Sequence, residues 1–146
     1  MIIGFTGTRK GMTPQQKSTV EALVLELKPK QAHHGDCVGA DADFNSICIK
    51  LNTLREHNTL IHIHPGCVIG NPQRANCSGW YQMYSIKPFL DRNHDIVDAC
   101  DRLIVCPGEF QEQRRSGTWA TYRYALKTKK LIYVVYPDGT VLGRDA

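Results

Sequence analysis

The chain has 146 residues, a length that fits one domain with one hydrophobic core. Hydrophobic residues make up 42% and charged residues 22%, and the 12 Gly and 7 Pro are spread along the chain, which excludes disordered, collagen-like and low-complexity proteins. No apolar run approaches the roughly 20 residues that span a bilayer, and the N-terminal residues lack the basic leader of a signal peptide. We therefore expect a single domain over residues 1–146, cytoplasmic and without a membrane partner.

The positive charge is concentrated in one part of the chain. The formal net charge is +4, and residues 109–130 hold six basic and two acidic residues, which accounts for the whole excess. A local excess of this kind suits an anionic partner, although a solvated helix face is the commoner reason for such a run.

Short apolar runs alternate with amphipathic segments along the chain. The first helix is expected to begin at Thr13-Pro14, because threonine is a favoured N-cap and proline a favoured first helical residue, and to end before Pro29. Further helices are predicted from about residue 41, over 88–100 and over 116–128. Strands are predicted over residues 2–6, 31–34, 60–64, 102–106 and 131–136.

This alternation predicts an α/β class and a single Rossmann-like domain. Right-handed crossovers between parallel strands place helices on both faces of the sheet. We expect about five parallel strands in the order 3-2-1-4-5. Residues 66–86 show no sustained period and are rich in Gly, Asn, Pro and Ser, so a long loop is predicted there.

The unusual segments all follow predicted strands. In such sheets a ligand binds beyond the carboxyl ends of the strands, near the point where the strand order reverses. The segments that should meet there are residues 7–11, 35–41, 64–66 and 107–118. The sequence therefore predicts one crevice formed by four loops.

Three of these loops have features of phosphate-binding turns. Glycines between a strand and a helix let the backbone approach a phosphate, and the helix N-terminus offers free N–H groups and a partial positive charge. The spacing matches neither a P-loop nor a GxGxxG motif. The loops combine glycines with hydroxyl and cationic side chains, which favours a phosphate or nucleotide pocket: Gly7-Thr8-Arg9, Gly35 with Gly39, and Arg115-Ser116-Gly117-Thr118.

The same segments resemble a known superfamily. Residues 34–41, His-Gly-Asp-Cys-Val-Gly-Ala-Asp, look like the GG-x-x-G-x-D turn of the DNA-processing protein A family with Asp36 at the second glycine, and Gly7-Thr8-Arg9 resembles its first-strand turn. The segment from Arg92-Asn93 to Pro107-Gly108, followed by Gly117-Thr118, is similar to the "lonely guy" cytokinin-activating phosphoribohydrolases. Together these features resemble the SLOG superfamily, whose members often form oligomers. The resemblance implies a Rossmann-like fold, a nucleotide-type ligand and a homo-oligomer.

One departure bears on activity. The phosphoribohydrolases use an arginine, here Arg92, and the glutamate that ends Gly-Thr-x-x-Glu, which is Thr121 in this chain. Glu109, Glu112 or Asp36 could replace that glutamate in an N-glycosidase that acts on a nucleoside monophosphate. Without such a replacement the resemblance implies a binder, which would act as a sensor or sequestering protein for a nucleotide-derived signal, for example in conflicts between phages and hosts. Single-stranded nucleic acid bound along residues 109–130 is a further alternative.

The predicted site combines these residues, and no cofactor is expected. Thr8, Arg9 and the loop amides would hold phosphates, Arg92 and Arg115 would neutralise charge, and Asp36 or Asp41 would accept from a sugar hydroxyl or cap the second helix. The predicted ligand-binding residues are Gly7, Thr8, Arg9, Gly35, Asp36, Gly39, Asp41, His64, Arg92, Asn93, Pro107, Gly108, Arg115, Ser116, Gly117, Thr118 and Trp119. The catalytic pair of the enzyme alternative would be Arg92 and Glu109.

Two rival sites use cysteine. With no secretion signal we expect the six cysteines to stay reduced. His62, His64, Cys67 and Cys77 are zinc-type ligands over sixteen residues, although their spacing matches no common zinc motif and packing in a strand and a loop is the commoner explanation. Gly35-x-Cys37-x-Gly39 has the form of a nucleophile elbow, which would need a base such as His64 or His94.

Overall fold

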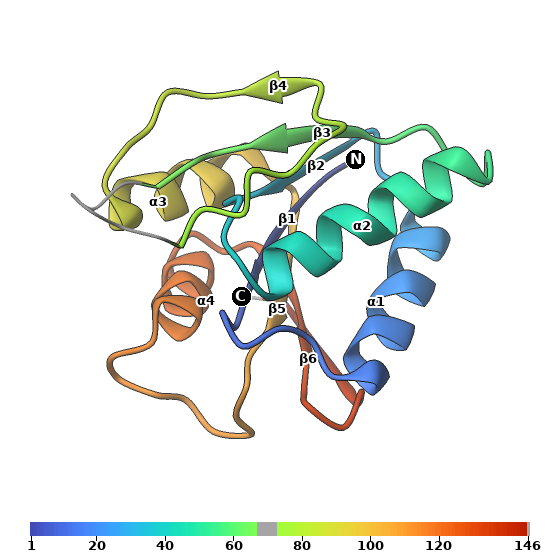
Figure 1. Ribbon diagram of the computed structural model, residues 1–146. Coiled ribbons are helices and arrows are strands. Elements are labelled where there is room, and N and C mark those ends of the chain that lie inside the picture. The colour runs from blue at the N-terminus through green and yellow to red at the C-terminus, as the bar shows by residue number, and fades with distance from the viewer. Residues whose placement is uncertain (67–72, 146) are drawn as a thin grey trace.

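The computed structural model describes residues 1–66 and 73–145, and shows an α/β protein with one mainly parallel sheet (Figure 1). The strands in the described residues are β1 (Ile2–Gly7), β2 (Gln31–His34), β3 (Leu60–Ile63), β4 (Gln82–Met83), β5 (Arg102–Cys106), β6 (Leu131–Val135) and β7 (Val141–Asp145). The helices are α1 (Pro14–Leu27), α2 (Ala40–Thr53), α3 (Phe89–Ala99) and α4 (Gly117–Lys127).

The sheet confirms the predicted α/β class and corrects its size. Its order is β4-β3-β2-β1-β5-β6-β7, with β7 antiparallel to β6 and all other neighbours parallel. The five predicted strands lie in the predicted order, as β3-β2-β1-β5-β6, but the prediction of about five strands is wrong in number and leaves out both ends of the complete order. The two additional strands lie at the edges. β4 falls inside the predicted loop over residues 66–86, and its two exposed residues show no apolar alternation that sequence reasoning could use.

Helices cover both faces of the sheet (Figure 1). On one face α1 and α2 pack on the apolar side chains of β1, where the rings of Phe5 and Phe44 stack with centroids 4.3 Å apart. On the other face α3 and α4 pack on β5 and β6 in a second core that contains Leu103, Trp119 and Tyr122. The carboxyl ends of the central strands therefore open between the first turns of helices from both layers.

Local sequence signals set the helix starts. The Thr13 hydroxyl accepts from the Gln16 N–H, and the Gln16 side chain accepts from the Thr13 N–H, a capping box that starts α1 where the sequence predicts. Ser116 caps α4 by accepting from the Trp119 N–H at 3.2 Å. By contrast, the N-cap residue before α2 is Gly39, whose φ of 92° favours glycine and whose missing Cβ would lie 2.8 Å from the Cα of Arg9.

None of the helices within residues 1–66 and 73–145 is long and apolar enough to cross a membrane. The longest, α1 and α2, have 14 residues each. A helix of that length spans about 21 Å, against about 30 Å for the hydrocarbon core of a bilayer.

Candidate functional site

A pocket of about 280 Å³ lies at the carboxyl ends of β1 and β2, against the first turns of α3 and α4. The predicted residues that line it are Gly7, Arg9, Gly35, Asp41, Arg92, Asn93, Arg115, Gly117 and Thr118. Its other lining residues are Phe5, Thr6, Cys37, Phe89 and Ile96. We call this set of fourteen residues the arginine pocket. The structure thus brings together residues from three of the four loops predicted to meet.

Three arginines reach the pocket from different elements. Arg9 comes from the β1–α1 loop, Arg92 from the second turn of α3, and Arg115 from the loop before α4. In the part of the chain that the structure describes, none of the three forms an ion pair with a carboxylate. The guanidinium carbons of Arg9 and Arg92 each lie over the Phe89 ring, 5.1 Å from its centroid, so both cations contact this ring. The lining therefore holds three arginines and one carboxylate, Asp41, so cations outnumber acidic groups in it.

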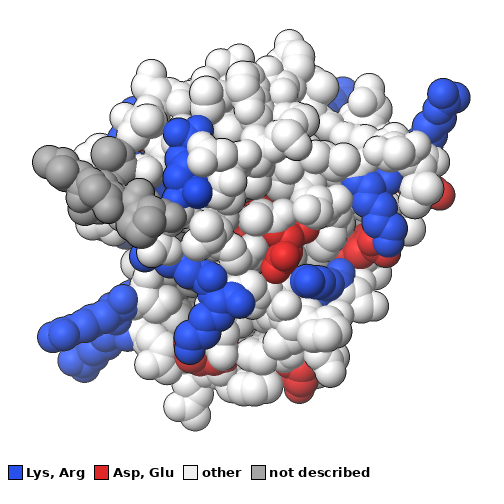
Figure 2. All heavy atoms as spheres, in the orientation of Figure 1, with Lys and Arg blue, Asp and Glu red and all other residues white. Residues whose placement is uncertain are grey.

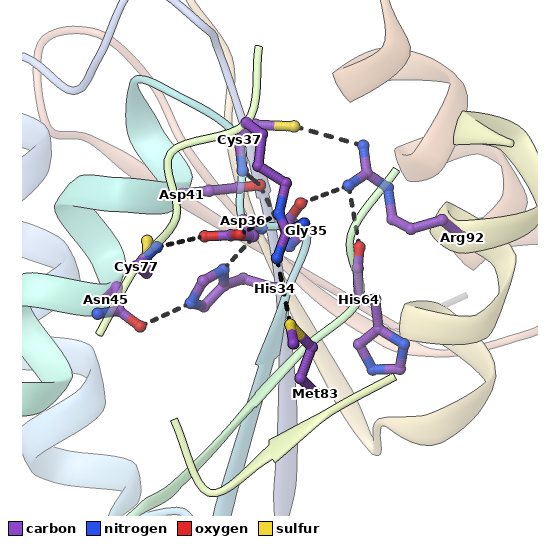
Figure 3. Close-up of polar contacts among 11 residues, drawn as sticks. His34, Gly35, Asp36, Cys37, Asp41, Asn45, His64, Cys77, Met83 and Arg92 are labelled. Carbon is purple, nitrogen blue, oxygen red and sulfur yellow. Dashed lines mark hydrogen bonds and ion pairs between the residues drawn. The ribbon is translucent and has the colours of Figure 1, made fainter. Parts of the chain in front are cut away.

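Arg92 is the most buried of these cations, with 5% of its surface exposed. Its Nη1 donates to the carbonyl oxygens of Gly35 at 2.5 Å and His64 at 3.1 Å, and its Nε donates to Asn93 Oδ1 at 2.7 Å. Its Nη2 lies 3.4 Å from Cys37 Sγ (Figure 3). All of these acceptors are neutral. Burying a cation without a hydrogen-bonded carboxylate is costly, so an anion in the pocket would offset part of that cost.

Gly35 makes this arrangement possible. A Cβ at residue 35 would lie 2.7 Å from the guanidinium carbon of Arg92 and 3.0 Å from Asp41 Oδ2. Only a residue without a side chain lets the guanidinium reach the end of β2. A glycine is therefore needed at residue 35 because the Arg92 side chain packs against its backbone, and not because a phosphate approaches it.

Asp41 organises the loop after β2. Its Oδ2 accepts from the N–H groups of Gly35 and Cys37, both at 3.2 Å, and the side chain is buried. Burial raises the pKa of Asp41, while the charges of His34 and Arg92 act in the opposite direction. Its side chain makes no capping bond to α2. Two roles were expected for Asp41, capping of α2 and acceptance of a hydrogen bond from a sugar hydroxyl. The geometry leaves the second role, a contact with a ligand, as the remaining prediction.

Asp36 lies outside the pocket lining, although its sequence position predicts a ligand contact. Its Oδ2 accepts from Arg74 Nε at 2.7 Å and its Oδ1 from the Cys77 N–H at 2.8 Å (Figure 3). Burial raises the pKa of Asp36, but the hydrogen bonds from Cys77 and Arg74 outweigh it and leave the pKa below its usual value. Asp36 therefore anchors residues 74–77 over the end of β2.

Several other predicted residues support the pocket from outside its lining. Thr8 accepts from the Ala40 N–H through its backbone carbonyl, and its side chain lies beside Gly108. The Pro107 carbonyl accepts from the buried Gln16 Nε2 at 2.8 Å. Gly39 and Ser116 start α2 and α4. These residues form the turns that hold the lining residues of the pocket in place.

The structure does not bring the predicted catalytic pair together in the pocket. Arg92 lines the pocket, but Glu109 does not, and its Oε1 accepts from Trp119 Nε1 at 2.9 Å. Trp119 itself is 2% exposed and belongs to the core between α4 and the sheet. Thr121, at the position of the family glutamate, is buried and donates its hydroxyl to the Gly117 carbonyl at 2.8 Å.

The predicted zinc ligands do not form a metal site in the described residues. His62 Nδ1 is hydrogen-bonded to Tyr84 OH at 2.9 Å, and His64 Nε2 to His33 Nδ1 at 2.7 Å. Cys67 lies outside the described residues, and within those ranges no group of three or more His, Cys, Asp or Glu side chains could hold a metal ion. His64 therefore belongs to a packed cluster.

We call His33, His62, His64 and Tyr84 the histidine cluster. The rings of His33 and His62 stack at 4.4 Å, and those of His64 and Tyr84 at 4.3 Å. Burial lowers the pKa of His33 to about 3 and that of His64 to about 4, and it also lowers the pKa of His62. These imidazoles are therefore neutral near pH 7.

Cys37 lines the pocket but lacks the partners of a nucleophile. Burial and the charge of Asp41 raise the pKa of its thiol, whereas Arg92 acts to lower it. The His64 ring is in the histidine cluster, and the His94 ring stacks on Tyr124 with centroids 3.8 Å apart. Neither candidate base reaches the thiol, so the nucleophile-elbow hypothesis has no support in this geometry.

Sequence reasoning missed Phe89 and Ile96, although a signal was present. Together with Arg92 and Asn93 they have the spacing i, i+3, i+4, i+7, which places all four on one face of α3. Both Arg92 and Asn93 were expected to face the ligand, so the same face predicts the other two.

Comparisons with protein-family models and with curated proteins gave no match to this chain. Its likeness to the SLOG superfamily therefore stays a prediction from the motifs. The fold and the arginine pocket carry the functional argument.

Proposed function

We propose that this protein binds a nucleotide or nucleotide-derived signalling molecule in the arginine pocket and acts as a sensor or sequestering protein. The observation that carries the proposal is Arg92, a buried cation with only neutral hydrogen-bond acceptors, next to Arg9 and Arg115. Three guanidinium groups that converge without carboxylate partners create a site for a charge-dense anion, and arginine is well matched to phosphate oxygens.

The start of α4 supports a phosphate position. Gly117 and Thr118 line the pocket at the first turn of this helix, where backbone N–H groups have no partner within the helix. A Cβ added to Gly117 would meet no atom within 4 Å, so the space in front of this turn is open. Arg115 is two residues before it. A phosphate there would gain N–H donors, the helix dipole and a guanidinium together.

Binding without cleavage agrees best with the carboxylates present. Among the described residues Asp41 is the one carboxylate in the lining, and its hydrogen bonds with the N–H groups of Gly35 and Cys37 hold the loop after β2. Glu109, the substitute expected for an N-glycosidase, is bonded to Trp119. Cleavage of an N-glycosidic bond needs a carboxylate at the anomeric carbon. The hydrolase is the alternative outcome of the experiment below.

The wider parts of the proposal rest on the sequence motifs. We place the sheet among Rossmann-like folds and the chain in the SLOG superfamily, and we expect a homo-oligomer in the cytoplasm. Nucleic acid is the alternative partner for the basic residues, and Figure 2 shows Lys and Arg side chains on the side of the molecule where α4 lies as well as on the opposite side, where α1 and α2 lie. A pocket of about 280 Å³ lined by three arginines suits a small anion better than a long strand.

Thermal unfolding with phosphate, AMP, ADP-ribose or cyclic AMP tests the proposal. At least one of these ligands should raise the melting temperature and be recovered unchanged by chromatography. Arg115→Gln should weaken its binding at least tenfold, because the residue lines the pocket. Arg114→Gln is the matched control, since Arg114 is the neighbouring arginine and lies outside the lining.

Two results would overturn the proposal of a binder. A freed base in the recovered ligand would make the protein a hydrolase. No shift with any of the four ligands, together with salt-dependent binding of an oligonucleotide, would move the function to the basic surface.

A further inference from the structure

Asp41 stands out as a carboxylate inside a pocket for anions. It is 6% exposed and contributes to the lining, and in the described ranges it has no ion pair with Arg92 or any other cation. The N–H groups of Gly35 and Cys37 both donate to its Oδ2 atom. The second oxygen, Oδ1, can therefore carry a proton without breaking either bond.

Charged and titratable groups face Asp41 from every side of the pocket. His34 on β2 and Arg92 on α3 favour the ionised carboxylate. The thiols of Cys37 in the following loop and Cys106 on β5 are close enough for the Asp41 charge to act on them, as is the thiol of Cys77. Arg9 lines the same pocket from the β1–α1 loop. Burial outweighs these favourable charges and raises the pKa of Asp41.

We propose that Asp41 takes up a proton from solvent when the anion binds, and that the neutral acid then donates its O–H to an oxygen of that anion. This inference rests on the proposed function of the arginine pocket. A buried, ionised carboxylate and a phosphate in the same pocket repel each other, whereas the acid form replaces that repulsion with a hydrogen bond. No bond other than O–H forms or breaks, and the proton comes from water. Asp41 is thus a specificity residue that selects ligands with acceptor oxygens.

The expected signature is proton-linked binding. If one proton is taken up with each anion, the affinity rises by up to about tenfold for each unit that the pH falls. Sulfate is a suitable probe because its charge does not change between pH 5.5 and 8, and phosphate is the second probe. Calorimetric titrations in buffers of different ionisation enthalpy give the number of protons taken up. We expect this number to increase as the pH is lowered.

Asp41→Asn isolates the contribution of this residue. Its amide can still accept the two loop N–H bonds through oxygen and donate to the anion through nitrogen, so binding should persist while proton uptake disappears. Subtracting the variant from the wild type also removes the protons that phosphate itself exchanges. Asp43→Asn is the matched control: Asp43 is on the same helix and also accepts a backbone N–H, from Met12 at 2.9 Å, but lies outside the lining.

The outcomes separate this inference from the proposed function. Binding of either probe with no proton uptake, or uptake that Asp41→Asn retains, would overturn the role of Asp41 and leave the pocket as an anion site. Failure of both probes and of every nucleotide named above to bind would overturn the proposed function and this inference with it.

Discussion

The arginine pocket and the histidine cluster both bury basic side chains, but they do so in different ways. In both regions the described basic groups have no hydrogen-bonded carboxylate. Arg92 stays charged because a guanidinium does not lose its proton in proteins. The buried histidines instead become neutral, with the pKa of His33 lowered to about 3. The charged guanidinium of the pocket therefore attracts anions, whereas the neutral, stacked imidazoles of the cluster do not.

The largest expected effect is a loss of stability in acid from the histidine cluster. The folded-state pKa values of about 3 for His33 and about 4 for His64 lie below the ordinary 6.5, so the unfolded chain binds protons first. Stability is therefore full above pH 6.5 and falls as the pH is lowered. Between pH 7 and 5 we expect a loss of about 2 kcal/mol for each histidine, or about 4 kcal/mol in all.

Urea unfolding at pH 7, 6 and 5 measures this loss. His33→Phe keeps a ring in the stack and should remove about half of the pH dependence. His94→Phe is the matched control, because the His94 ring stacks on Tyr124 outside the cluster. An unchanged pH dependence in His33→Phe would show that the cluster does not stay neutral on burial.

Alanine substitutions at two glycines of the arginine pocket, Gly35 and Gly117, test how closely Arg92 packs on the end of β2. Gly35→Ala should lower the free energy of unfolding by about 2–3 kcal/mol, since the new Cβ would overlap the guanidinium of Arg92. It should also weaken anion binding by displacing that guanidinium. Gly117→Ala should change stability by less than about 1 kcal/mol, because nothing lies within 4 Å of the added Cβ. Urea unfolding and calorimetry measure both effects. Equal effects of the two substitutions would contradict the packing of Arg92 on Gly35.

The smallest expected effect is that of Glu109→Gln, which tests whether residue 109 lies outside the pocket. Glu109→Gln keeps an oxygen that can accept from Trp119 Nε1, so stability should change by less than about 1 kcal/mol. Anion affinity should also stay within about threefold of the wild type, because Glu109 is not in the lining. Calorimetric titration with the ligand found by thermal unfolding makes the measurement. A loss of tenfold or more would return Glu109 to the site and reopen the hydrolase alternative.

The sequence predicted much of the candidate site, because parallel strands carry their following loops to the same edge. Arg9 and Arg115 are far apart in the chain, yet both lie in loops that follow predicted strands, whereas Arg92, on α3, was expected at the site from the family motif that it resembles. Sequence reasoning could not tell lining residues from supporting ones. Asp36 and Asp41 are in one loop, and which of the two faces the pocket depends on the contacts of Asp36 with Arg74 and Cys77, which no local pattern encodes.

The sequence by itself determined the helices, the inner strands and the edge of the sheet where the loops meet, since caps, prolines and apolar periods act over a few neighbouring residues. Tertiary structure decided the edge strands β4 and β7, the separation of His64 from the ligand pocket, and the placement of Glu109 on Trp119. It also decided the charge of each buried group. Charge depends on burial and on the neighbours brought from other elements, and those are fixed only when the layers pack.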